Sequence, residues 1–300
     1  MKTPRFSLGS WAFSFGPFES DPWSFDRFVE YAADAGYDGL EINGFRPHPH
    51  PQDFDTTEKR TELRKRIEGA GLGISGYAPD FRDVPPAECD TAAYLAELEP
   101  MLAFMKDLGI ETLRVDSVSP PDELSGAEWE EKFTRLAATW QAAAERAAQD
   151  GVRIVWEFEP GFWLNKPSEV LAVLDAVDSP AFGVLFDTSH AHMGAVIGAR
   201  QTGEQELLAG GVAEYAAKLD GRIGHIHLID CDGTLHNDET STHSPFGEGD
   251  VDFKGTLAAL KPTWQNIEWC CFDFCFCPTT EVDARKAIPF VKDLLASIPD

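Results

Sequence analysis

Four polar side chains stand at the ends of four short apolar segments in the second half of the chain: Glu157, Asp187, His227 and Asp273. Each segment alternates, so that apolar residues such as Trp156 occupy one face of a strand and these four occupy the other. If the segments are neighbouring parallel strands, three carboxylates and an imidazole meet at one end of a sheet. Such carboxylates repel one another unless a cation or protons are present. The set therefore predicts a site for one divalent metal ion, with Mn²⁺ expected first and Mg²⁺, Co²⁺ or Zn²⁺ as alternatives.

Residues beside these four predict a substrate-binding site. Glu159 shares the inward parity of the first ligand, and His190 follows the second by three positions, within reach of a ligand hydroxyl or carbonyl oxygen. Trp163 offers an aromatic face to a sugar ring, although ordinary loop packing explains it as well. The same two readings apply to Trp11, Phe13 and Phe162. His225 lies one layer deeper than the metal histidine, so we interpret it as a supporting or packed core residue.

The rest of the chain alternates short apolar runs with longer helical patterns. Eight runs are predicted strands, over residues 7–13, 39–42, 73–77, 112–116, 153–158, 183–187, 223–229 and 269–274. Strands that alternate with helices favour a parallel sheet, and eight units over 300 residues fit a closed barrel. An open doubly wound sheet would carry a glycine-rich turn after its first strand, and none follows Phe13. We therefore predict an α/β fold, a single (β/α)8 TIM barrel over residues 1–300.

Amphipathic spacing predicts helices over residues 25–35, 95–108, 127–149, 166–177, 204–219 and 280–297. Three long irregular segments remain, at residues 44–55, 81–90 and 230–252. In a barrel all three leave the C-terminal ends of strands, so we expect them to overhang the mouth. The proline- and histidine-rich residues 46–51 either cover the site or form a stiff solvated loop, which is the more ordinary reading.

Composition limits the partners and the compartment. The chain has 51 acidic and 25 basic residues and a formal net charge of -26. Such a surface repels nucleic acid and anionic membranes, so we expect neither, although a local pocket can still accept a small phosphorylated ligand. The sequence shows no signal-peptide pattern and no apolar run of membrane-spanning length, which predicts a cytoplasmic protein. These features are also compatible with a homo-oligomer.

Four of the six cysteines crowd one segment: Cys270, Cys271, Cys275 and Cys277. Paired cysteines of a structural zinc site are normally separated by two to four residues and sit in a small loop-rich unit. Here alternate cysteines would face opposite sides of one strand. We therefore predict buried small core residues in preference to a soft-metal site.

Four motifs resemble the xylose isomerase-like barrel superfamily of sugar (phosphate) isomerases and epimerases, which includes the ketose 3-epimerases. They are Trp156-Glu157-Phe158-Glu159-Pro160, Phe186-Asp187-Thr188-Ser189-His190, Gly224-His225-Ile226-His227 and Phe246-Gly247-Glu248-Gly249-Asp250. The resemblance implies that Glu157, Asp187 and His227 hold one metal ion. It also implies a last acidic ligand on the eighth strand. Parity and nearness to the strand end favour Asp273 for that role over Glu268.

The resemblance further implies a reaction on a small sugar, either a ketose or a sugar phosphate. The metal would bridge a ketose carbonyl and the neighbouring hydroxyl and stabilise the enediolate that forms on deprotonation. Glu157 and Asp273 (or Glu268) would move the proton, and His190 would hold the enediolate oxygen. This predicts a metal-dependent sugar isomerase or epimerase. An epimerase of the family has an arginine shortly after the metal histidine, where this chain has Gly233.

Two alternatives to an isomerase or epimerase stay open, and a third is disfavoured. The same residues would serve a lyase or dehydratase acting on a keto-sugar or cyclitol, or a non-catalytic sugar-binding barrel. The related endonuclease branch needs several more histidine ligands on the early strands, where this chain offers Glu41, Tyr77 and Asp116. The net charge of -26 also opposes DNA binding, so we disfavour that branch.

Overall fold

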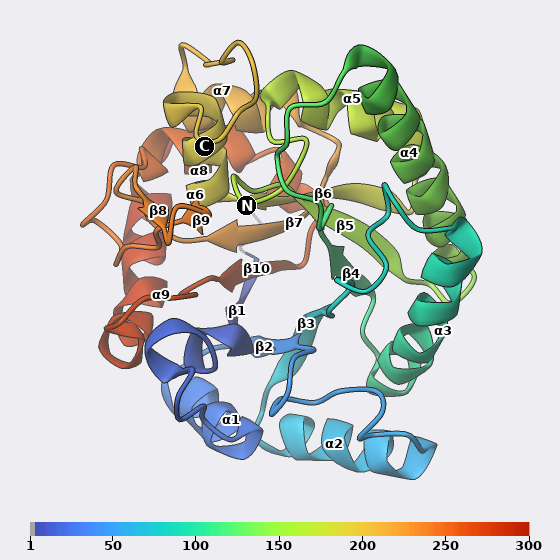
Figure 1. The fold of residues 1–300 in the computed structure, drawn as a ribbon. Helices are drawn as coiled ribbons and strands as arrows, with labels where there is room; N and C mark the ends of the chain where they lie inside the picture. The colour runs from blue at the N-terminus through green and yellow to red at the C-terminus, as the bar shows by residue number, and fades with distance from the viewer. Residues whose placement is uncertain (1–3, 300) are drawn as a thin grey trace.

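A closed barrel of parallel strands forms the centre of the computed structural model, which describes residues 4–299 (Figure 1). The order around the barrel is β1-β10-β7-β6-β5-β4-β3-β2. These strands are β1 (Arg5–Gly9), β2 (Gly39–Asn43), β3 (Gly73–Ala78), β4 (Thr112–Val115), β5 (Arg153–Glu157), β6 (Phe182–Asp187), β7 (Ile223–Leu228) and β10 (Trp269–Phe272). The strands β8 (Leu235–His236) and β9 (Thr240–Ser241) form an antiparallel pair in the loop after β7. The predicted (β/α)8 TIM barrel is confirmed.

Helices connect the strands and surround the barrel (Figure 1). They are α1 (Phe25–Asp34), α2 (Thr57–Gly69), α3 (Thr91–Leu108), α4 (Gly126–Ala148), α5 (Pro167–Val177), α6 (Thr188–His192), α7 (Gly211–Lys218), α8 (Phe253–Leu260) and α9 (Thr280–Ser297). Side chains of Ser24, Thr56 and Ser125 accept backbone N–H groups at the starts of α1, α2 and α4, which satisfies donors that the helix itself leaves free. None of the described helices has the length and apolarity needed to cross a membrane.

Several predicted boundaries need correction. The first strand stops at Gly9, and residues 10–13 form a 3-10 turn in place of the predicted strand end. A Cβ at Gly9 would lie 2.2 Å from the Trp11 ring, so the glycine makes room for this turn. The helix predicted over residues 204–219 is only α7, which begins at Gly211 after a second glycine. The sequence analysis missed α2 because only Leu63 and Ile67 of that polar helix are buried.

Alternation along the strands decides which side chains reach the barrel interior. Trp156 of β5 packs against Trp140 of α4, with ring centroids 5.3 Å apart. Phe186 of β6 packs against Tyr215 of α7, with centroids 6.0 Å apart. Because these aromatic residues face the helices, their neighbours Glu157 and Asp187 face the interior. Tyr77 of β3 likewise packs against a helix, with its ring 5.2 Å from that of Phe104 in α3.

Candidate metal centre

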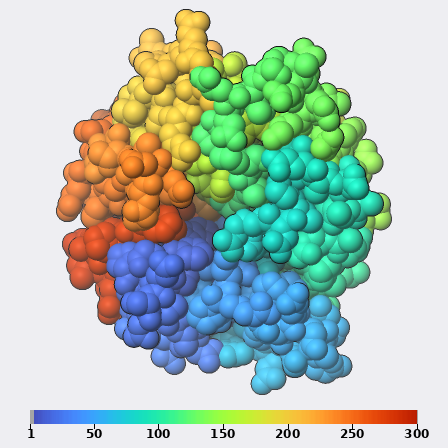
Figure 2. Space-filling model, viewed as in Figure 1, coloured from blue at the N-terminus to red at the C-terminus, as the bar shows by residue number. Residues whose placement is uncertain are grey.

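Glu157, Asp187, His227 and Asp273 come together at the C-terminal end of the barrel. Each offers one ligand atom, and these atoms all lie within 4.8 Å of one another. They come from β5, β6, β7 and the residue after the end of β10, which are neighbours in the barrel order. All four residues are buried beneath a cavity of about 530 Å³ that opens at the mouth. Figure 2 shows this face of the molecule hollowed near its centre.

Hydrogen bonds hold one oxygen of each carboxylate and leave the other toward the shared centre. Arg114 Nε donates to Glu157 Oε2 at 2.7 Å. The backbone N–H groups of Ser189 and His190 donate to Asp187 Oδ1 at 2.8 and 2.9 Å. The remaining atoms are buried and face one another: Glu157 Oε1 lies 3.0 Å from His227 Nδ1, and Asp187 Oδ2 makes no hydrogen bond among the described residues. A cation between them would satisfy the unpaired Asp187 oxygen, so three carboxylates and an imidazole fit a bound divalent cation.

Asp273 follows the same pattern from the eighth strand. Its Oδ1 accepts hydrogen bonds from the Trp11 indole N–H at 2.7 Å and from the backbone N–H of Cys275 at 2.8 Å. Its Oδ2 lies 3.6 Å from His227 Nδ1. The carboxylate is therefore oriented by two donors before any ion binds.

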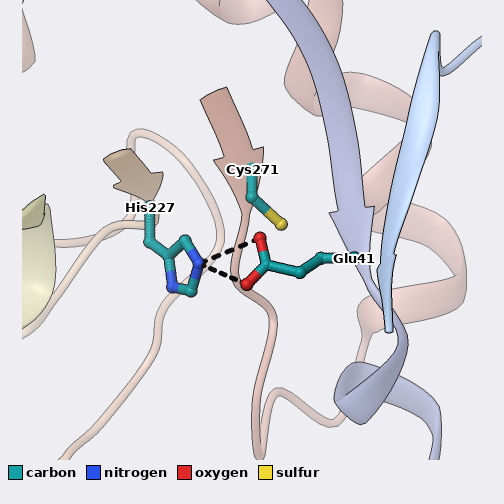
Figure 3. A group of neighbouring side chains, drawn as sticks. All are labelled: Glu41, His227 and Cys271. Carbon is teal, nitrogen blue, oxygen red and sulfur yellow. Dashed lines mark hydrogen bonds and ion pairs between the residues drawn. The ribbon is translucent and has the colours of Figure 1, made fainter. Parts of the chain in front are cut away.

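Glu41 fixes the orientation of the His227 ring from within the barrel (Figure 3). His227 Nε2 lies 3.3 Å from each Glu41 oxygen, and His225 Nε2 lies 2.7 Å from Glu41 Oε2. A proton on His227 Nε2 directed at Glu41 leaves the Nδ1 lone pair for a metal. Cys271 lies beside this pair, but burial raises the pKa of its thiol well above the ordinary value, and only a thiolate binds metals well. We interpret this group as support for His227.

Electrostatics in the cluster also favour a cation. Burial, reinforced by the charges of Asp273 and Glu157, raises the pKa of Asp187 to about 7, although His243 lowers it. Burial also acts to raise the pKa of Glu157, but the Arg114 and His227 charges outweigh it and hold that pKa at about 2. One carboxylate of the cluster therefore resists ionisation in the absence of a cation. A bound cation would relieve that repulsion.

The sequence matches the xylose isomerase-like TIM barrel family over residues 29–294. The chain belongs to this family. The resemblance noted from the four motifs is thus confirmed, and the match extends over most of the barrel.

Two curated members of the family are similar to this chain over much of its length. Inosose dehydratase from Lacticaseibacillus casei is 23% identical over 283 residues, covering 89% of this chain and 85% of that protein. Fructoselysine 3-epimerase from Escherichia coli O157:H7 is 23% identical over 237 residues, covering 74% of this chain and 76% of that protein. Among solved structures, that of the IolI protein with a bound zinc atom superposes with a TM-score of 0.71 at 16% identity, covering 98% of this chain and 97% of that chain. These relatives are enzymes of two reaction types, a dehydratase and an epimerase.

Two of the three predicted substrate-binding residues, His190 and Glu159, line the cavity above the candidate metal cluster. The His190 ring Nδ1 lies 2.5 Å from Ser241 Oγ, and its Nε2 lies 4.0 Å from both Glu157 Oε1 and Glu159 Oε2. Glu159 also accepts a hydrogen bond from Thr240 in β9. Both residues are therefore held in place by the strand pair β8-β9 above the mouth.

Trp163, the third predicted substrate-binding residue, does not line the cavity. Its ring packs edge-on against Trp129 of α4, with centroids 6.0 Å apart, and its backbone pairs with Ser117 and Ser119. Its neighbour Phe162 lines the cavity instead. Parity could not distinguish the two, because it holds along a strand and these residues lie in the loop after β5.

Glu268, the alternative last ligand, lies at the other end of the barrel. It precedes β10, its side chain is 58% exposed, and it pairs with Arg5 at 3.1 Å. The residue at the mouth end of this strand is Asp273.

His243 is a residue of the site that sequence analysis missed. It belongs to the loop between β9 and α8, is 5% exposed, and neither ring nitrogen makes a hydrogen bond among the described residues. Its Nδ1 lies 3.4 Å from Asp273 Oδ1, and it gathers with Asp187 and His190 within 4.8 Å. It comes from the irregular segment 230–252, where no strand parity applies.

Asp230 holds the loop that carries His243. Its buried carboxylate accepts the backbone N–H groups of Gly247, Gly249 and Val251 at 2.9 to 3.1 Å. A Cβ at Gly249 would lie 2.4 Å from Asp230 Oδ1, so only glycine fits there. The fourth motif of the sequence analysis thus acts through its backbone and anchors the loop.

Arg114 of β4 is a second missed residue. Its guanidinium contacts three carboxylates, at 2.7 Å from Glu157, 2.5 Å from Asp116 and 3.4 Å from Glu159. Because the Arg114 guanidinium already pairs with three carboxylates, we do not expect it to bind a substrate anion.

The remaining predictions concern the cysteines and one loop. Cys270 packs in the main core and Cys271 faces the interior, as alternation predicted, while Cys275 lines the cavity.

His48, in the proline-rich loop, is buried, and its ring nitrogens lie 3.0 Å from Ser10 Oγ and 3.1 Å from the Trp23 carbonyl oxygen. The loop of residues 46–51 is thus anchored beside the barrel, and the interpretation of this segment as a merely solvated loop is wrong.

Proposed function

We propose that this protein is a metal-dependent isomerase or epimerase that moves a proton next to the carbonyl of a keto-sugar. The observation that carries the proposal is the set of three buried carboxylates and one imidazole, whose ligand atoms lie within 4.8 Å of one another beneath a cavity of about 530 Å³. The dehydratase and epimerase among its relatives support chemistry of this kind. The zinc atom in the IolI structure supports a divalent ion, and Mn²⁺, Mg²⁺, Co²⁺ and Zn²⁺ all suit the ligand set.

The residues divide the work as follows. A divalent ion held by Glu157, Asp187, His227 and Asp273 would polarise the substrate carbonyl and stabilise negative charge on its oxygen. Glu157 Oε1 then accepts the proton from the carbon beside the carbonyl, because Arg114 already holds its other oxygen. Asp273, on another strand, returns a proton to the opposite face or to the adjacent carbon. His190 and Glu159 orient substrate hydroxyl groups from the cavity wall.

A solvent-exchange assay tests the proposal. The Mn²⁺-loaded protein is incubated in D₂O with a panel of ketoses and keto-cyclitols, and each sugar is recovered and examined by NMR and mass spectrometry. We expect one class of substrate to return as a deuterated isomer or epimer, with exchange lost in Glu157→Gln. Tight sugar binding without exchange in any member of the panel would instead identify a non-catalytic binding barrel and overturn the proposal.

The position of His243 favours a dehydratase as the second candidate. Its Nδ1 lies 3.4 Å from Asp273 Oδ1 and its Nε2 makes no hydrogen bond among the described residues, so the ring is placed to give a proton to a hydroxyl that leaves after deprotonation. The same incubation distinguishes the reactions, since a dehydratase releases water and forms an enone or a dione. In that case His243→Asn would abolish loss of water but retain proton exchange, whereas an epimerase would keep its product in this variant.

A further inference from the structure

A second cavity lies at the opposite, N-terminal end of the barrel. It measures about 620 Å³, which is the size of many small-molecule sites. It is bounded by residues at the starts of the strands, including Gly73 of β3, Thr112 of β4 and Trp269 of β10. Its charged and titratable lining residues are Arg5, Arg64, Glu68, Glu111, Arg153, His225 and Glu268. The lining thus combines three arginines with three glutamates, and what distinguishes the arginines is which of them has an acidic partner.

Arg153 occupies the inner part of this cavity. It is the first residue of β5 and shares the inward parity of Glu157, so its side chain enters the barrel. A Cβ at Gly183 would lie 2.6 Å from Arg153 Nη2, and a Cβ at Gly224 would lie 3.0 Å from its Cζ. Glycines at the starts of β6 and β7 therefore leave the space that the guanidinium fills.

Arg153 makes no ion pair with any residue that the structure describes, and its Nε is buried without a hydrogen-bond partner. The other two arginines of the cavity differ, since Arg5 pairs with Glu268 at 3.1 Å and Arg64 with Glu68 at 2.7 Å. Burial lowers the pKa of Arg153, with no neighbouring carboxylate opposing it. A partly buried charge without a partner is unfavourable, so a partner from solution would be stabilised there.

We propose that this cavity binds a small molecule through a phosphate group that pairs with Arg153. The guanidinium offers a planar fork of donors that matches phosphate oxygens, and a fully paired arginine would not. Glu111 lies exposed at the edge of the same cavity and opposes anion binding. The site is separate from the metal cluster, which lies at the other end of the same strands.

Calorimetric titration of the metal-loaded protein tests the site, with inorganic phosphate and fructose 6-phosphate as probes and fructose as the uncharged control. We expect both phosphates to bind, and Arg153→Met to weaken each by at least about tenfold. Arg222→Met is the matched control because it removes one positive charge near the same end, from an exposed pair with Asp175 outside the cavity. The Arg222→Met variant should bind both phosphates with the affinity of the wild type.

Glu111→Gln tests the site without touching the arginine. Removing this carboxylate should tighten phosphate binding about two- to tenfold, because only one exposed negative charge is lost. Phosphate bound at the metal end would be indifferent to both Arg153→Met and Glu111→Gln, and that result would overturn the proposal. So would the absence of binding to the wild type at about 10 mM phosphate. Binding of inorganic phosphate alone would assign the site to the free ion, and stronger binding of fructose 6-phosphate to a phosphorylated metabolite.

Discussion

The strand β5 places a residue of opposite charge at each end of the barrel interior. On β5, Arg153 and Glu157 face the interior four residues apart, which corresponds to about 13 Å of strand. At the mouth, Glu157, Asp187 and Asp273 each have one oxygen held by hydrogen-bond donors and the other directed toward the shared centre. At the other end, the arginine has space made for it but no described partner. The difference shows that inward parity alone selects a face, while the hydrogen bonds around each residue decide what it can bind.

The largest expected difference in kcat/KM is between variants of the two acidic residues that flank β10, Asp273 and Glu268. Asp273→Asn should lower kcat/KM by about a hundredfold to ten-thousandfold, because it removes the proposed metal ligand and proton donor of the eighth strand. Glu268→Gln should leave kcat/KM near that of the wild type, since it removes only an exposed pair with Arg5. Steady-state kinetics on both variants measure this. Equal losses in the two would contradict the placement of the reaction at the mouth.

Replacing each of the two interior arginines should change the free energy of unfolding by a different amount. Arg114→Met leaves Glu157, Asp116 and Glu159 without their shared cation and should destabilise the metal-free protein by about 3–5 kcal/mol. Arg153→Met removes a charge that has no partner and should change stability by about 1 kcal/mol or less. Urea unfolding in the presence of a chelator compares them. If Arg153→Met proved the more destabilising, that arginine would be a structural plug and not an anion site.

Glu41→Gln should weaken metal binding at the mouth and leave phosphate binding at the opposite end unchanged. The glutamate accepts from His227 and sets which ring nitrogen faces the metal, so its loss should weaken Mn²⁺ binding about 10- to 100-fold. Titration of Mn²⁺ followed by electron paramagnetic resonance provides the measurement. Phosphate affinity at the opposite end should be unchanged in this variant, which serves as its internal control.

The smallest effect concerns independence of the two ends. Metal and phosphate should each raise the free energy of unfolding, and the sum should match the effect of both together within about 0.5 kcal/mol. Thermal unfolding with each alone and with both checks this. A larger deviation would mean that the chain from His225 through Glu41 to His227 couples the ends.

Strand residues were predictable from the sequence, and loop residues were not. Glu157, Asp187, His227 and Asp273 were found because each follows an apolar residue that must face a helix, and that rule is local. The sequence could not show that Trp163 lies outside the cavity lining or that His243 lies beside the cluster, because both are in loops whose conformation depends on distant contacts. For His243 the deciding contact is Asp230, which bonds backbone groups 17 to 21 residues further along the chain.

Arg114 was missed for another reason. Its inward parity was readable from the alternation in β4, but arginine at a barrel end has no chemical role until its partners are known. Those partners are Glu157 at the end of β5, Glu159 just beyond it and Asp116 just beyond β4, and only the closed barrel brings them within 3.4 Å. The eight-strand pattern predicted that β4 and β5 are neighbours, yet it could not show that one guanidinium serves three acids.

The attachment of the 230–252 segment to Asp230 has a consequence for how this protein can change. Both ends of the segment are fixed to the barrel, through the carboxylate of Asp230 and its backbone pairing with Ser244. Apart from Thr240, Ser241 and His243, which contact Glu159, His190 and Asp273, the residues between can vary in sequence without displacing the proposed cation ligands below. Mutational exploration of those residues is therefore an economical way to alter substrate preference while the chemistry underneath is conserved.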